Sequence, residues 1–291
     1  MNKNFNKFFI VYFAVSFLTT VAYAQISLNF TNAAATGKDG PTQSQVNTAY
    51  DNTTLDDAVT INTQGIQEWT VPATATYTIE VYGAQGGRSK LLDFSTWYDG
   101  GKGAKMVADF SLTQGDVLKI LVGQQGVEFG NNYRGAGGGG GTFVVLSSGT
   151  TLLIAAGGGG GAGDYAYSGD GQTSTSATAG GNTSSNVGAG AGGSNGAGGS
   201  PHSYGAGGAG WSGNGSNGNS TTGGKSFANG GQGGTGYTPS HGSDGGFGGG
   251  GGSYAGAGGG GGYSGGGGGY WSYSGNGGGG GSYIKNTASN T

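Results

Sequence analysis

The sequence has no cysteine and very little charge. Of its 291 residues, 11 are Lys or Arg and 14 are Asp or Glu, which gives a net charge of -3 at pH 7. Without cysteine the fold has neither disulfides nor thiolate chemistry, so it depends on backbone hydrogen bonds and packing. Without clustered Lys and Arg it lacks the electrostatic surface that nucleic acid requires. We therefore expect no nucleic-acid partner.

Side chains that could carry catalysis or hold a metal are also scarce. His202 and His241 are the only histidines, and each lies in a polar glycine-serine stretch without a carboxylate at metal-ligand or base-orienting spacing. Asp164, Asp170 and Asp244 lie in glycine-rich stretches, but they do not reproduce the G-G-x-G-x-D spacing of calcium-binding repeats. We interpret the histidines as solvated loop residues and expect no metal site.

A nucleotide site is not supported either. Gly224-Lys225-Ser226 resembles the end of a phosphate-binding loop, but the first glycine of G-x-x-x-x-G-K-[ST] would fall on Asn219. No serine lies in a G-x-S-x-G elbow between a strand and a helix. We expect a non-enzymatic chain with no catalytic or cofactor-binding residues and no cofactor.

One long apolar run occurs, at the start of the chain. Lys3 and Lys7 lead into the apolar residues 8–21, and Ala22-Tyr23-Ala24 is an A-x-A cleavage signature. An uncleaved anchor is the alternative, but about 14 apolar residues fall short of the roughly 20 that a spanning helix needs. We expect residues 1–24 to be a signal peptide, the mature chain to lack a membrane span, and the protein to be secreted or held at the cell surface.

Glycine dominates what is present, with 76 residues. Six runs have the same length of five, at residues 137–141, 157–161, 248–252, 258–262, 265–269 and 277–281. A flexible linker does not need a fixed run length, whereas polyproline-II helices of equal length could pack as a layer of constant thickness. Glycine would be required there because a side chain that faces a neighbouring backbone would clash. The runs predict a bundle of glycine-rich polyproline-II helices.

Disorder is the alternative, because abundant glycine and serine without a strict period are typical of low-complexity chains. A self-associating segment with regularly spaced aromatics is a third interpretation. The low charge argues against disorder, and so do aromatic residues that border the glycine runs. These are Phe143, Phe247, Tyr254, Tyr263, Tyr270, Trp271 and Tyr283.

Residues 59–156 have the alternation of β-strands. In residues 77–81, Tyr77, Ile79 and Val81 fall on one face of the predicted strand, opposite Thr78 and Glu80. No stretch shows amphipathic helical spacing with caps. We therefore predict an all-β fold, an antiparallel β-sandwich or barrel-like scaffold. Further strands are predicted at residues 59–62, 66–71, 104–112, 117–122, 142–146 and 152–156.

Two short glycine-bearing turns predict hairpins. They are Gln114-Gly115-Asp116 and Ser147-Ser148-Gly149. Together the patterns divide the chain into a signal peptide at 1–24, a polar N-terminal segment at 25–58, and a β scaffold with the first glycine tracts at 59–156. A glycine-rich bundle follows at 157–284, and a polar tail at 285–291 where a longer protein could be truncated.

Several segments resemble the extracellular glycine-rich domain of the anaplastic lymphoma kinase and leukocyte tyrosine kinase receptors and its bacterial secreted relatives. The resemblance covers about residues 30–283, and its most specific parts, residues 65–74 and 120–126, are not low in complexity. The other parts are residues 40–43, 47–50, 82–87, 138–144, 153–160, 224–226 and 246–249.

The resemblance implies a β-sandwich similar to the tumour-necrosis-factor fold, with the polyproline-II bundle inserted between strands, and a role in binding an extracellular protein. The chain departs from the receptors at Ala33 and Val46, which stand where they have a cysteine pair. The closing strand that follows the last glycine run in the family is expected to be absent here. Because the chain contains no kinase domain, signalling activity is not implied.

Aromatic side chains are the strongest candidates for a binding surface. Trp97, Tyr98 and Tyr133 are expected in loops, and Trp211, Tyr270, Trp271 and Tyr273 in or beside the glycine region. The alternative, which we favour for these rings, is that they cover the glycine tracts. The sequence predicts a module for binding or adhesion, with an extracellular protein or glycan as partner. The alternative is a structural matrix, self-assembling or ice-interacting surface protein.

Overall fold

The computed structural model describes residues 27–90, 96–130, 135–163, 169–181, 189–238, 241–270 and 275–288. The expected signal peptide lies outside the described residues, as do Tyr133, Asp164, Trp271 and Tyr273. The regular structure of the described part is almost entirely β-strand, so the predicted all-β class is confirmed. No helix in these ranges is long and apolar enough to cross a lipid bilayer.

The larger sheet has six strands in the order β1-β2-β7-β8-β9-β10. Every neighbouring pair in it is antiparallel. The strands are β1 Val59–Thr63, β2 Ile66–Thr70, β7 Val117–Leu121, β8 Thr142–Leu146, β9 Thr151–Ala156 and β10 Tyr283–Ile284.

A two-stranded sheet of β3 (Ala75–Tyr82) and β6 (Lys105–Leu112) packs on the larger sheet. The predicted alternation in β3 is confirmed, because Val81 is buried and Tyr77 and Ile79 are half-buried while Thr78 and Glu80 are exposed. A third, smaller sheet pairs β4 (Ser89–Lys90) with β5 (Trp97–Tyr98). Trp97 and Tyr98, expected in a loop, thus form a short strand.

One of the two predicted hairpins is confirmed. β8 and β9 pair across the turn that includes the 3-10 segment Ser148–Thr150. The turn at Gln114-Gly115-Asp116 joins no hairpin, because β6 pairs with β3 and β7 pairs with β2 and β8. It carries the chain from one sheet to the other. A glycine-bearing turn indicates that the chain changes direction, but it does not indicate which strand the next strand pairs with. β6 pairs with β3 over the full length of both strands.

The expectation of no capped helix was wrong. Helix α1 (Gln43–Tyr50) begins at Thr42, whose hydroxyl accepts from the Gln45 amide while the Gln45 side chain accepts from the Thr42 amide. This capping box satisfies amides that the first turn leaves unpaired. Val46 and Tyr50, four residues apart, are the buried side chains. Eight residues are too few for a helical period to stand out in the sequence.

Two hydrophobic clusters lie on opposite faces of the larger sheet. The first fills the space between the two sheets and includes Val81 and Phe110 from the smaller sheet and Ile120, Val144 and Ile154 from the larger. The second joins the larger sheet to the glycine region. It consists of Ile66, Leu121, Phe143, Val145, Leu152, Ala155, Phe227 and Phe247, with Trp211, Tyr263 and Tyr283 packed against them.

A strand does follow the last glycine run, contrary to expectation. β10 pairs with β9 through Tyr283 opposite Ala155 and Ile284 opposite Ile154. Two residues are too short a run for alternation to be visible in the sequence. The glycine run itself places them beside β9, because the amide of Gly280 donates to the carbonyl of Gly158, in the run that follows β9 (2.9 Å).

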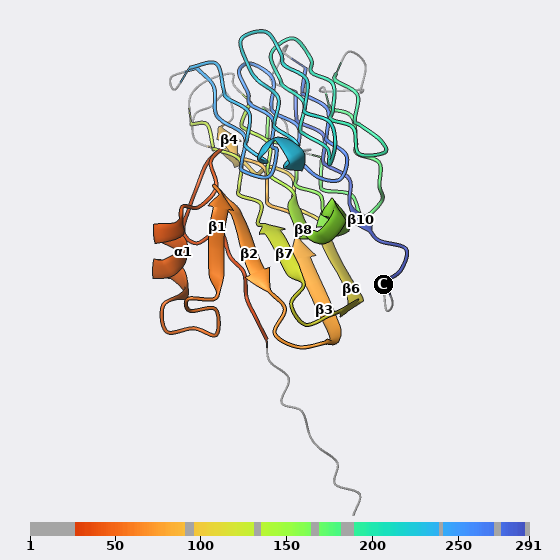
Figure 1. Ribbon diagram of the computed structural model, residues 1–291. Helices are drawn as coiled ribbons and strands as arrows, with labels where there is room; N and C mark the ends of the chain where they lie inside the picture. Colours follow the sequence, from red (N-terminus) through yellow and green to blue (C-terminus); the bar gives the residue numbers. More distant parts are fainter. Residues whose placement is uncertain are drawn as a thin grey trace, which may run out of the picture.

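The glycine-rich segments form a separate layer above the sheets (Figure 1). They are extended and contain little regular secondary structure apart from the 3-10 segment Phe227–Asn229. Backbone hydrogen bonds connect them to one another and to residues 83–87 and 100–104. The region is therefore a hydrogen-bonded body continuous with the β scaffold.

These hydrogen bonds repeat at every third residue. The amides of Gly158 and Gly161 donate to Gly261 and Gly258 of one neighbouring segment, at 2.8 and 2.9 Å. A segment in which residues i and i+3 face the same neighbour completes one turn in three residues. The same repeat recurs where Gly159 and Ala162 donate to Ala84 and Gly87, and where Gly138 and Gly141 donate to Gly251 and Gly248.

Close backbone contact explains why glycine is required. A Cβ atom at Gly160 would stand 2.0 Å from the carbonyl oxygen of Gly277, and one at Gly159 would stand 1.8 Å from that of Gly101. Real Cβ atoms do not approach backbone so closely. One of the six equal runs is not uniform, because Gly248 and Gly249 have φ angles of 100° and 84°. This run therefore begins with a turn, not as an extended segment.

Candidate functional site

The glycine layer has an end next to the sheets and an end far from them. Gly141 directly precedes β8 and Gly157 directly follows β9, so these residues mark the near end. Ala136 and Ala162 lie at the other end of the same two segments, where the Ala136 amide donates to the Ala162 carbonyl (2.8 Å). We call this the distal end.

Tyr204, Tyr237 and Tyr254 form a cluster of rings at the distal end, here called the tyrosine cluster. The amide of Gly135, next to Ala136, donates to the carbonyl of Tyr254 (3.0 Å), which places Tyr254 there. The ring centroids of Tyr237 and Tyr254 are 4.6 Å apart, and those of Tyr204 and Tyr254 are 5.0 Å apart with nearly perpendicular planes. Tyr237 keeps 45% of its surface exposed, so the cluster faces solvent.

Both histidines lie beside tyrosine rings. The ring centroids of His241 and Tyr237 are 6.3 Å apart, and those of His202 and Tyr270 are 4.5 Å apart. His202 is half-buried, and its Nδ1 is buried without a hydrogen-bond partner in the structure. Desolvation lowers the pKa of His202 from its ordinary value, because burial disfavours the charged imidazolium. The interpretation of His202 as a solvated loop residue was therefore wrong.

Trp97 forms a second aromatic surface. The guanidinium carbon of Arg88 lies 4.5 Å from the centre of its ring, and the ammonium of Lys90 lies 5.0 Å from the same ring. Arg88 also pairs with Glu128, and this hydrogen bond, with the carboxylate charge, raises the pKa of the guanidinium. A tryptophan whose ring is contacted by two cations contributes binding area whose position is fixed by its neighbours.

Trp211 is partly buried and packs against the hydrophobic cluster that joins the glycine region to the larger sheet. Its ring lies 5.1 Å from that of Phe227 and 6.2 Å from that of Phe143, centre to centre. Tyr263 and Tyr283 stack at 4.7 Å in the same hydrophobic cluster. These three aromatic residues therefore act as covering residues, whereas Tyr237 at the distal end is exposed.

The remaining polar candidates, Asp170, Asp244 and the Gly224-Lys225-Ser226 stretch, make hydrogen bonds within the fold. Asp170 accepts from the amide of Lys102 (2.7 Å) and Asp244 from that of Gly236 (2.8 Å). The amide of Lys225 donates to a backbone carbonyl and that of Ser226 to a side-chain oxygen, so neither is directed at a phosphate. Within the described ranges, no three His, Asp or Glu side chains come together as a metal site.

Sequence reasoning missed two members of the tyrosine cluster. Tyr254 and Tyr270 were identified from the sequence because they border five-glycine runs. Tyr204 and Tyr237 lie in shorter polar stretches and were not identified. The shared signal is a tyrosine next to glycine with few charged neighbours, which many positions in this chain satisfy. Only the folding of the segments onto one end shows which tyrosines meet.

Comparison with known proteins gives a partial relationship. No protein-family model matches the chain. Over 101 residues the chain is 38% identical to the leukocyte tyrosine kinase receptor of Mus musculus. The match covers 33% of this chain and 11% of the receptor. It supports a resemblance to this receptor over a limited part of each protein.

Proposed function

We propose that this protein is a secreted or cell-surface module that binds an extracellular protein or glycan through its distal end and performs no catalysis. The contact of the exposed Tyr237 with the ring of Tyr254 is the observation that carries the proposal. Packed, partly exposed tyrosines supply contact area at low entropic cost, which is why they are enriched in binding surfaces. The partial similarity to a receptor is compatible with this role.

The proposed architecture makes the distal end rigid. Extended glycine segments with hydrogen bonds at every third residue support polyproline-II helices, which have three residues per turn. Two sheets around one core are compatible with a tumour-necrosis-factor-like sandwich. In this proposal the division of the chain at residues 24, 58, 156 and 284 separates a signal peptide, an N-terminal segment, the scaffold, the bundle and a tail.

The second candidate function is a structural or ice-interacting surface. It is favoured by an outer segment of the glycine layer in which Thr173, Ser174, Thr175 and Ser176 are all exposed. These four residues form a bend of the chain, and their grouped hydroxyls offer polar contacts to water or to further copies of the protein. Thermal hysteresis or ordered self-assembly of the purified protein would favour this function over binding.

The binding proposal is tested by comparing two exposed tyrosines. Mature protein with Tyr237→Ala and with the control Tyr82→Ala would be applied to a glycan array and to extracellular proteins from its native milieu. Tyr82 is 54% exposed on β3, and its carbonyl accepts from the Thr142 hydroxyl at the start of β8, which places it at the end of the glycine layer opposite the tyrosine cluster. We expect wild type and Tyr82→Ala to retain a partner that Tyr237→Ala loses. Equal binding by all three proteins would contradict the proposed site.

A further inference from the structure

The two edges of the six-stranded sheet are protected differently. At the β1 edge, the Gln43 side chain of α1 donates to the carbonyl of Val59 (3.0 Å) and accepts from the amide of Ile61 (2.7 Å). The helix therefore satisfies backbone groups that a further strand would need. Blocking an edge in this way prevents pairing with other chains.

At the β10 edge, one residue keeps its backbone groups directed outward. The amide of Lys285 donates to the Leu153 carbonyl of β9 (2.8 Å). Since the backbone groups of successive residues in an antiparallel strand point to opposite sides, those of Ile284 point away from β9. On the same side, the amide of Ser282 donates to the carbonyl of Ser174 (2.7 Å). The pairing with residues 172–174, which also includes the bond from the Gln172 amide to the Gly280 carbonyl (2.8 Å), thus ends at Ser282 and does not continue to Ile284.

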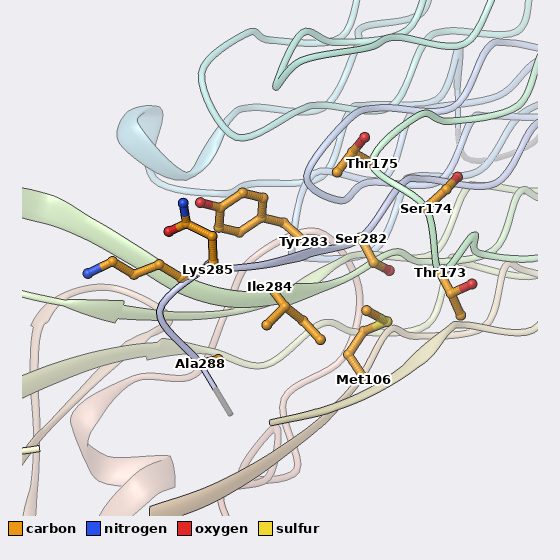
Figure 2. A pocket seen from close by; sticks show the side chains of 10 residues that line it. Met106, Thr173, Ser174, Thr175, Ser282, Tyr283, Ile284, Lys285 and Ala288 are labelled. Atoms are coloured by element: carbon orange, nitrogen blue, oxygen red, sulfur yellow. The ribbon is translucent and has the colours of Figure 1, made fainter. Parts of the chain in front are cut away.

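A groove of about 410 Å³ opens beside Ile284. Figure 2 shows the side chains of Ile284 and Met106 directed into it from the two sheets. Both side chains, with Ala288, belong to the border of the core between the sheets. The groove therefore combines an outward-facing peptide unit with an apolar entry to the core, which are the two features that strand addition uses.

The charge of the lining indicates the composition of the occupant. Lys285 is the only charged residue in the lining, and Figure 2 shows its ammonium group directed away from Ile284 and Met106, so the groove itself presents no charged group. The rest of the rim is formed by hydroxyl and amide side chains of Thr173, Ser174, Thr175 and Asn286. We propose that the groove binds an extended, uncharged segment of another polypeptide, which adds as a strand beside Ile284 and inserts one apolar side chain between Ile284 and Met106.

The test uses a phage-displayed library of random linear peptides, selected on the full mature chain. Selected peptides should share an apolar residue with uncharged neighbours, and binding should slow hydrogen exchange at the Ile284 amide. Met106→Arg, which fills the groove with a cation, should weaken binding at least about tenfold, as expected for a charge placed in a binding core. Ser111→Arg, at an exposed position on the same strand, is the matched control and should leave affinity unchanged.

Ile284→Pro provides a second variant in case Met106→Arg disturbs the fold. It removes an amide that faces the groove and makes no bond to β9, so circular dichroism should be unchanged while peptide binding is lost. Selection of no peptide, or of peptides that bind both variants as wild type, would overturn the proposal. Concentration-dependent dimerisation abolished by Met106→Arg would overturn it in favour of a second copy. Because Tyr237→Ala leaves the groove intact, the test is independent of the distal site.

Discussion

The ring of Phe247 packs against Gly65 so closely that a Cβ atom on Gly65 would stand 2.2 Å from its Cζ. Gly65 lies in the turn between β1 and β2, whereas Phe247 directly precedes a five-glycine run. Phe247 is fully buried in the hydrophobic cluster on the outer face of the larger sheet. This contact fixes the glycine layer to the scaffold.

Phe247→Ala should therefore destabilise both parts together. Removing a fully buried phenylalanine costs about 3–5 kcal/mol of unfolding free energy. We expect a single cooperative urea transition with a lower midpoint. The control is Phe30→Ala, which removes a partly buried ring on the other side of the sheet. If the Phe247 variant lost only the glycine layer in a separate transition, the two parts would be independent.

Interior glycines of the layer should not tolerate a methyl group. In Gly160→Ala the Cβ would meet the Gly277 carbonyl oxygen at 2.0 Å, and neither backbone can move without breaking hydrogen bonds. We expect a loss of about 3 kcal/mol or more, at the upper end of overpacking costs. Gly181→Ala is the control, because its Cβ would meet only the Asn276 Cβ at 4.0 Å, and its stability should stay within about 0.5 kcal/mol. Thermal denaturation distinguishes the two.

The parts of the fold that were predictable have strong local signals. Alternation in β3 identified its buried face because Tyr77, Ile79 and Val81 form a long enough pattern. β4, β5 and β10 have two residues each, too few to show a period, and pairing alone defines them. The partner of β6 was missed because strand pairing depends on contacts distant in sequence. The turn at Gly115 carries no information about them.

The cap of α1 offers a local test. Thr42→Ala removes the hydroxyl that accepts from the Gln45 amide and should cost about 1 kcal/mol, the usual value for an N-cap. Thr42→Ser keeps the hydroxyl and should stay near wild type. Because Gln43 bonds the β1 edge, hydrogen exchange at Ile61 should also become faster in Thr42→Ala. No change in either measurement would mean that packing of Val46 and Tyr50 alone holds the helix.

His202 should make stability depend on pH. Burial lowers its pKa in the folded protein below the value of the unfolded chain, so the unfolded state takes up a proton more readily. Stability should fall as the pH decreases through the ordinary histidine range near about 6.5 and below. His202→Gln should remove this part of the dependence, whereas His241→Gln should keep it. The free energy of unfolding would be measured between pH 7 and 5. The same dependence on pH in wild type, His202→Gln and His241→Gln would contradict the role of His202.

The candidate site was only partly accessible from the sequence. Trp97 was identified as a binding candidate, but the cations of Arg88 and Lys90 on its ring depend on the pairing of β4 with β5. Tyr237 and Tyr204 meet Tyr254 only because separate segments end at the same distal surface. The glycine runs specify close packing without specifying which runs are neighbours.

Residue-resolved amide hydrogen exchange of the mature protein tests the central claim, that the glycine layer is an ordered body supporting the distal end. The amides of Gly158, Gly161 and Gly280 donate to carbonyls inside the layer. They should be protected to about the same degree as the amides of β8 and β9, since one cooperative unit protects its buried amides alike. Exchange at unstructured rates in the glycine runs, with protection confined to the sheets, would show a disordered segment attached to a small scaffold and would contradict the account.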